Sequence, residues 1–98
     1  MRTRQKGQRL IDRDRAETIA AEGLAFLAEE PAHLRHFFLT SGLDPAALRA
    51  RADTPEVLLA VLEYLANDEP LLLVFAASRK VAAESIGQAI AALQTTVP

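Results

Sequence analysis

Prolines placed one or two residues after helix-capping residues constrain the fold of this chain more than any other feature. One start signal occurs three times, as Leu43-Asp44-Pro45, Asp53-Thr54-Pro55 and Asp68-Glu69-Pro70. In each, an Asp or Thr side chain can accept a hydrogen bond from the first turn of a helix, and proline suits that turn because its missing N–H needs no partner there. Pro31 ends one predicted helix and begins the next. The chain is therefore predicted to form short helices joined by tight connections.

Composition predicts an all-α domain. Half of the 98 residues are apolar, and Ala and Leu, the strongest helix formers, dominate them. The densest apolar stretch, residues 54–77, is typical of two helices separated by a break at Asn67-Asp68. Because the second of these helices is apolar nearly all round, we expect it to lie at the centre of the fold. The expected fold is a small orthogonal bundle of five or six short helices.

The same signals divide the chain into an arm and one domain. We expect residues 1–12 to form a flexible basic arm and residues 13–98 a single helical domain. The expected helices cover about 14–29 with Asp14 as cap, 31–41, 45–52, 55–66, a helix from Asp68 to about Lys80, and a last helix carrying Ile86, Ile90 and Leu93. No Gly or Pro separates the last two helices, so a single bent helix is an alternative.

Two glycines carry structural expectations. Gly42 follows the second predicted helix and is expected to end it in the left-handed conformation. Gly23 lies inside the first helix, where glycine costs about 1 kcal/mol relative to alanine. A close approach of another helix would account for Gly23.

Several classes of site are absent from the sequence. The chain has no cysteine, which excludes disulfides, thiolate metal sites and cysteine nucleophiles. No apolar run approaches the roughly 20 residues that span a bilayer, and the apolar segment of a secretory signal is missing. No glycine-rich phosphate loop occurs, and Ser41 and Ser78 lack the pattern of a nucleophile elbow. We expect a cytoplasmic protein that is not an enzyme and has no cofactor.

Two acidic motifs have both a chemical and a structural interpretation. Glu30-Pro31-Ala32-His33 has the Glu-x-x-His spacing of di-iron bundles, and His36 follows three residues later. Such a site needs more carboxylates and a second motif, so we favour Glu30 as a charge near a helix N-terminus and expect no metal. Asp68 and Glu69 could perform acid–base chemistry as a pair. We favour a helix cap and a first-turn anion instead.

Charge is unevenly distributed along the chain. Residues 1–15 hold six basic and two acidic residues, a balance of +4, and because the whole chain is -2 the remainder is -6. A basic arm on an acidic body can contact an anion or nucleic acid. Nucleic acid is the less favoured partner, because the helix placed for recognition is Leu71–Phe75, which has no side chain that reads bases. The candidate contacts in the arm are Arg2, Arg4, Lys6, Arg9 and Arg13.

Three segments carry a family resemblance: Ala25–Pro31, Phe38–Arg49 and Val61–Phe75. Together they resemble an uncharacterised bacterial family labelled domain of unknown function 3572, over roughly residues 18–93. Members of that family open the last helix with a glycine and a proline–glutamate pair, whereas Arg79–Glu84 lacks both glycine and proline. The resemblance implies a small alphaproteobacterial cytoplasmic protein of unknown function, and it implies no catalytic residues.

The function favoured by the sequence is a non-catalytic helical interaction or adaptor module that binds another protein. Its support is the high apolar content of a small chain without a catalytic set. Leu59 and Leu71 lie off the main apolar stripes and are expected to form an exposed patch. The chain is expected to be a monomer or a homodimer, and the alternative function is nucleic-acid binding through the basic arm. The candidate interaction surface comprises Leu59, Tyr64, Asp68, Glu69 and Leu71.

Overall fold

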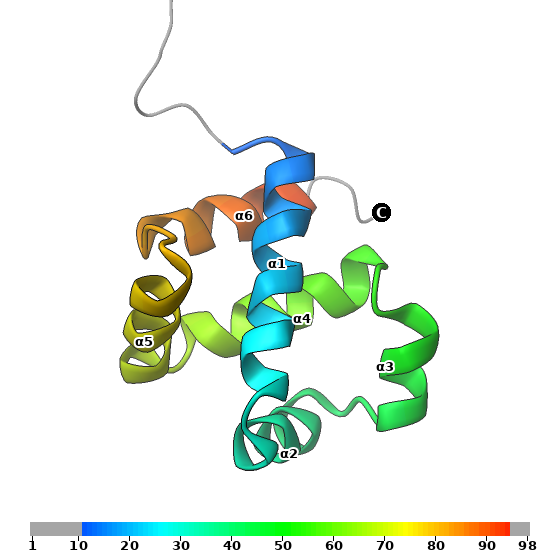
Figure 1. Cartoon of the computed structure of the whole chain (residues 1–98). Helices are drawn as coiled ribbons and strands as arrows, with labels where there is room; N and C mark the ends of the chain where they lie inside the picture. Colours follow the sequence, from blue (N-terminus) through cyan, green and yellow to red (C-terminus); the bar gives the residue numbers. More distant parts are fainter. Residues whose placement is uncertain (1–10, 95–98) are drawn as a thin grey trace, which may run out of the picture.

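The computed structural model describes residues 11–94, and within this range it contains six helices and no strand (Figure 1). This confirms the predicted small all-α bundle. Residues 1–10 and 95–98, which include most of the predicted arm, lie outside the described range. The helices are α1 (Arg13–Ala28), α2 (Pro31–Ser41), α3 (Pro45–Arg51), α4 (Pro55–Ala66), α5 (Glu69–Arg79) and α6 (Glu84–Gln94).

The core lies where α1 crosses α4 and α6. Figure 1 shows α1 running across both helices, and these three contact one another more extensively than any other helices. Burial of their large aliphatic side chains supplies most of the hydrophobic stabilisation, since each contributes roughly 1.5–3 kcal/mol when fully buried. The largest of these fully buried side chains are Ile19, Leu27, Val57, Val61, Leu62, Leu65, Ile86 and Leu93.

The prediction that the helix after Asn67 is central is wrong. Helix α5 packs against α4 and α1 at the edge of the bundle (Figure 1). It buries only Leu71 and Phe75, whereas α4 buries six residues. Leu73 and Val74 are 53% and 56% exposed. Apolar composition on all sides of a helix does not determine how many neighbouring helices cover it.

The three predicted start signals are confirmed. The side chains of Asp44, Thr54 and Asp68 each accept a hydrogen bond from the backbone N–H three residues later, at 2.7, 3.4 and 3.2 Å. Each satisfies one of the N–H groups that a helix start leaves without a partner. The caps therefore set where α3, α4 and α5 begin, and they fix the short connections between them.

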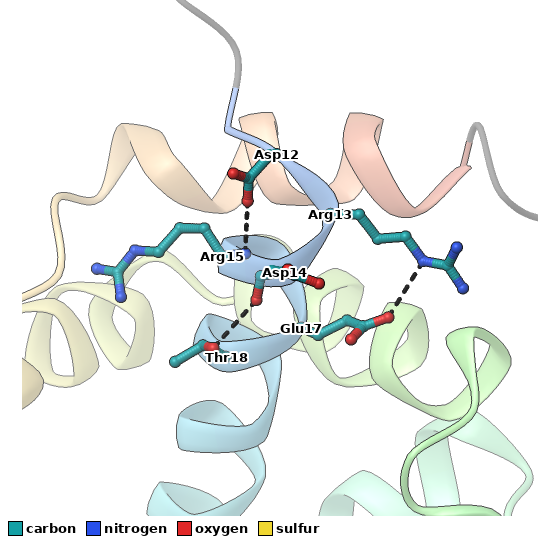
Figure 2. Close-up of polar contacts among 6 residues, drawn as sticks. All are labelled: Asp12, Arg13, Asp14, Arg15, Glu17 and Thr18. Carbon is teal, nitrogen blue, oxygen red and sulfur yellow. Dashed lines mark hydrogen bonds and ion pairs between the residues drawn. The ribbon is translucent and has the colours of Figure 1, made fainter.

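The cap of α1 differs from the prediction. Asp12, not Asp14, caps the helix, because its carboxylate accepts a hydrogen bond from the N–H of Arg15 at 2.8 Å (Figure 2). Asp14 lies in the first turn, where its negative charge is favourable. Its backbone carbonyl accepts from the Thr18 hydroxyl at 3.0 Å. Both aspartates are suitable cap residues, and capping by Asp12 gives a helix that is two residues longer.

Helices α5 and α6 are separate, which excludes the single bent helix. Lys80 adopts the left-handed conformation, with φ 57° and ψ 43°. The N–H groups of Lys80 and Val81 both donate to the carbonyl of Ala76, and Val81 is buried beneath the turn. This hydrogen-bond pattern usually ends a helix at a glycine. Here a lysine occupies that position. The predicted end of this helix near Lys80 is therefore confirmed, although no glycine marks it.

Both glycine expectations are confirmed. Gly42 has φ 80° and its N–H donates to the carbonyl of Phe38 at 3.1 Å, which ends α2. At Gly23, a Cβ atom would lie 3.0 Å from Cδ1 of Leu65 and 3.1 Å from Cγ1 of Val61. The close crossing of α1 and α4 therefore accounts for glycine at position 23.

Candidate interaction surface

The structure divides the predicted surface residues into two groups. Tyr64, Asp68 and Glu69 all border one hollow at the junction of α4 and α5. Leu71 is only 8% exposed and belongs to the core, and Leu59 packs half-buried against that core. The expected exposed patch of Leu59 and Leu71 is therefore corrected. Both leucines lie on helix faces that are turned toward neighbouring helices.

Tyr64 is the centre of this hollow. Its hydroxyl lies 2.7 Å from Nδ1 of His36, which brings α2 and α4 together. The ring also makes an edge contact with Phe37, with centroids 5.4 Å apart. The hollow has a volume of about 290 Å³ and is lined by His36, Thr40, Tyr64, Asn67, Asp68, Glu69 and Pro70.

Electrostatics keep the Tyr64 hydroxyl protonated. Burial raises the pKa of the Tyr64 phenol above its usual value of 10.0, and the nearby Asp68 carboxylate raises that pKa further. A tyrosine that acts as a base needs a lowered pKa instead. The raised pKa favours the neutral phenol, which can both donate and accept hydrogen bonds in this hollow.

The two histidines of the Glu-x-x-His region have different surroundings. His36 contacts Tyr64, whereas the ring of His33 stacks on Phe26 with centroids 6.4 Å apart. Glu30 precedes α2 as its cap residue, without a side-chain capping hydrogen bond. Residues 11–94 contain no group of three or more His, Cys, Asp or Glu side chains that could hold a metal ion.

The outer face of α5 carries an apolar stripe that was not among the residues predicted from the sequence. Pro70, Leu73, Val74 and Ala77 are all exposed, and their spacing of three, four and seven residues places them on one face of the helix. The opposite face holds the buried Leu71 and Phe75. The sequence feature that indicates this stripe is the apolar composition of α5 on all sides. It indicates a helix with two apolar faces, of which only one is covered by the bundle.

Charged residues lie at the two ends of this apolar stripe. Glu69 is the first residue of α5, and Arg79 and Lys80 end it. Arg79 donates to Glu29 at 2.6 Å and lies over the ring of Phe26, which fastens the end of α5 to α1. Within the described part of the chain, neither the Glu69 nor the Lys80 side chain forms an ion pair. Both charges are exposed and available to a partner.

The candidate nucleic-acid contacts are mostly outside the described residues. Arg2, Arg4, Lys6 and Arg9 fall there, while Arg13 forms an exposed ion pair with Glu17 at 3.2 Å (Figure 2). A hollow of about 560 Å³ beside α1 has an apolar floor and three acidic residues at its border, Asp14, Glu17 and Asp53. Acidic borders repel phosphate, so this hollow is not complementary to nucleic acid.

Comparisons with known proteins give one match. The model of a family described as "Protein of unknown function (DUF3572)" matches residues 13–96, so the chain belongs to this family and the resemblance found in the sequence is confirmed. No curated protein and no solved structure matches the chain. Among the described residues, no helix has both the length and the apolarity required to cross a membrane.

Proposed function

As the chain belongs to a family without an assigned function, we propose its role from its surface: it is a non-catalytic helical module that binds protein through the outer face of α5. The observation that supports this proposal is the exposed stripe of Pro70, Leu73, Val74 and Ala77. Amphipathic helices bind partner proteins through side chains at this i, i+3, i+4, i+7 spacing. We also expect the cytoplasm as its location.

The stripe has a neighbouring polar region that can orient a partner. Pro70 and Glu69 border the Tyr64 hollow, so the apolar stripe continues into hydrogen-bonding groups from His36, Tyr64 and Asn67. A partner that covers Leu73 and Val74 removes apolar surface from water, and it gains a directional contact at the hollow. An apolar centre with polar groups at its edge is the usual composition of a protein interface.

Photo-crosslinking in the native host tests this proposal. A photoreactive phenylalanine analogue at Val74 is expected to form an adduct with a discrete protein, because Val74 lies at the middle of the stripe. The same analogue at Ala91, an exposed position on α6, is the matched control. Adducts at both positions in equal amount, or at neither, would overturn the proposal.

Nucleic-acid binding through the basic arm is the second proposal, and it rests on the charge balance of +4 in residues 1–15 alone. Titration of a labelled duplex into the full chain at low salt tests it. The proposal requires affinity that falls steeply with added salt and disappears when residues 2–9 are deleted. Binding unaffected by that deletion would contradict it.

A further inference from the structure

We propose that the partner of the α5 stripe is a second copy of the chain, bound so that the two α5 helices lie antiparallel across a two-fold axis. This inference rests on the proposed binding role of the stripe. It adds the identity of the partner and the geometry of the contact. The axis passes between Leu73 and Val74.

The first support is the symmetry of the stripe about its own midpoint. Pro70 and Ala77 are each three and a half residues from the point between Leu73 and Val74, or about 5 Å along the helix. Two copies related by a two-fold axis at this point place Leu73 against Val74, and Pro70 against Ala77. The large side chains meet at the centre and the small ones at the edges. A self-complementary patch of this kind is what a two-fold dimer interface requires.

The second support is the charge at the two ends of α5. In the antiparallel arrangement, Glu69 of one copy and Lys80 of the other lie at the same end of the contact. Their backbones are offset by about 3 Å along the axis, which both long side chains can span. Both side chains are exposed and have no ion-pair partner in the described part of their own chain. The dimer would therefore contain two such ion pairs.

Charge also selects the direction of pairing. A parallel pair would place both Glu69 side chains at one end of the contact and both Lys80 side chains at the other, which is repulsive at both ends. It would also align the two helix dipoles, whereas antiparallel helices oppose them. The antiparallel pair is therefore favoured on both counts.

The size of the contact sets the expected affinity. One face of an 11-residue helix supplies less area than the roughly 1,200 Å² of a stable standard interface. We therefore expect a weak, reversible dimer with a dissociation constant on the order of 10–100 μM. Such a dimer dissociates on dilution, which makes it measurable with the full chain.

Sedimentation equilibrium of the purified full chain from about 5 μM to 1 mM tests the dimer. Val74→Glu places two carboxylates near the axis and is expected to raise the dissociation constant at least tenfold. Leu39→Glu is the matched control, because Leu39 is 76% exposed on α2 and lies outside the stripe. It is expected to leave the dissociation constant unchanged. Equal effects of the two variants, or none from Val74→Glu, would overturn the inference.

A charge exchange tests the antiparallel geometry. Glu69→Lys and Lys80→Glu are each expected to weaken self-association about tenfold, since each replaces two attractions by two repulsions. Mixing the two variants restores both pairs, so the mixture is expected to form a heterodimer at least as stable as the unmodified dimer. A loss of helix stability in either variant would not be repaired by mixing. Absence of heterodimer would contradict the geometry.

The outcomes separate this inference from the broader proposal. A chain that stays monomeric at 1 mM, yet crosslinks to a different protein from Val74 in the host, would overturn self-association and leave the binding role of the stripe intact. A monomer without any such adduct would overturn both.

Discussion

Helices α4 and α5 are consecutive, begin with the same capping device and are both rich in Leu and Val, yet their surroundings differ. Helix α4 buries six of its residues beneath α1 and α6, whereas α5 buries two and exposes an apolar face. The difference teaches that apolar content alone does not define a core helix. A helix that is apolar on both faces can belong to the core on one face and bind a partner with the other.

Replacing one leucine on each helix by alanine should give the largest difference in stability between α4 and α5. Leu62 on α4 is fully buried and Leu73 on α5 is 53% exposed. Leu62→Ala is expected to lower the free energy of unfolding by about 2–5 kcal/mol, because it leaves a cavity. Leu73→Ala is expected to change it by less than about 0.5 kcal/mol at micromolar concentration. Urea denaturation followed by circular dichroism measures both, and equal losses would contradict the assignment of α5 to the edge.

Alanine substitution at a buried and at an exposed helical glycine should change stability by an intermediate amount. Gly23→Ala is expected to destabilise the fold by about 1 kcal/mol, because crowding of the fully buried Val61 and Leu65 outweighs the gain in helix propensity. Gly87→Ala on α6 is the control, since nothing lies within 4 Å of its added Cβ. It should stabilise the fold by about 1 kcal/mol. Thermal unfolding distinguishes the two signs, and stabilisation by Gly23→Ala would show that α1 and α4 can separate.

Replacing Lys80, the left-handed residue at the end of α5, should change stability by a smaller amount. Lys80→Gly is expected to stabilise the monomer by about 0.5–1 kcal/mol, because glycine adopts φ 57° without strain. The same change removes the cation proposed to pair with Glu69, so self-association should weaken. Chemical denaturation at low protein concentration measures the first effect. A destabilised monomer would contradict the observed cap.

Titration of Tyr64 gives the smallest predicted effect on stability. The pKa of its phenol is raised in the folded chain, so the native state retains the proton more strongly than the unfolded state. Stability from this group is fully present below the unfolded pKa near 10 and is lost as pH rises through the folded pKa. Asp68→Asn removes the charge that contributes to the shift and should lower the pKa of Tyr64.

Absorbance near 295 nm follows this titration without interference, because Tyr64 is the only tyrosine and the chain has no tryptophan. Glu63→Gln is a suitable control, since Asp68 and not Glu63 contributes to the raised pKa of Tyr64. An unchanged Tyr64 pKa in Asp68→Asn would contradict the electrostatic account of the hollow.

Local signals in the sequence predicted the helix boundaries well. Asp44, Thr54 and Asp68 cap their helices as expected, and Gly42 ends α2, because each of these features depends only on a few neighbouring residues. The end of α5 near Lys80 was also predicted, but a single bent helix stayed an alternative because lysine adopts the left-handed conformation only rarely. Its placement depends on the burial of Val81 in the folded chain.

The candidate surface was predicted only in part, for a different reason. Asp68, Glu69 and Tyr64 lie close in sequence on adjoining helices, so their proximity followed from local structure. Whether Leu71 or Leu73 faces solvent depends on which side of α5 meets α1, a contact between distant segments. The sequence pattern indicates two apolar faces of α5, but it does not indicate which face is buried.

Pairing of two chains through the exposed face of α5 is tested most directly by dilution followed by nuclear magnetic resonance. Amide spectra of the uniformly labelled full chain would be compared at about 20 μM and 1 mM. We predict concentration-dependent shifts confined to residues 69–80 and the neighbouring hollow, and their loss in Val74→Glu. Spectra that do not change with concentration, or shifts that cluster on α3, would contradict self-association through α5.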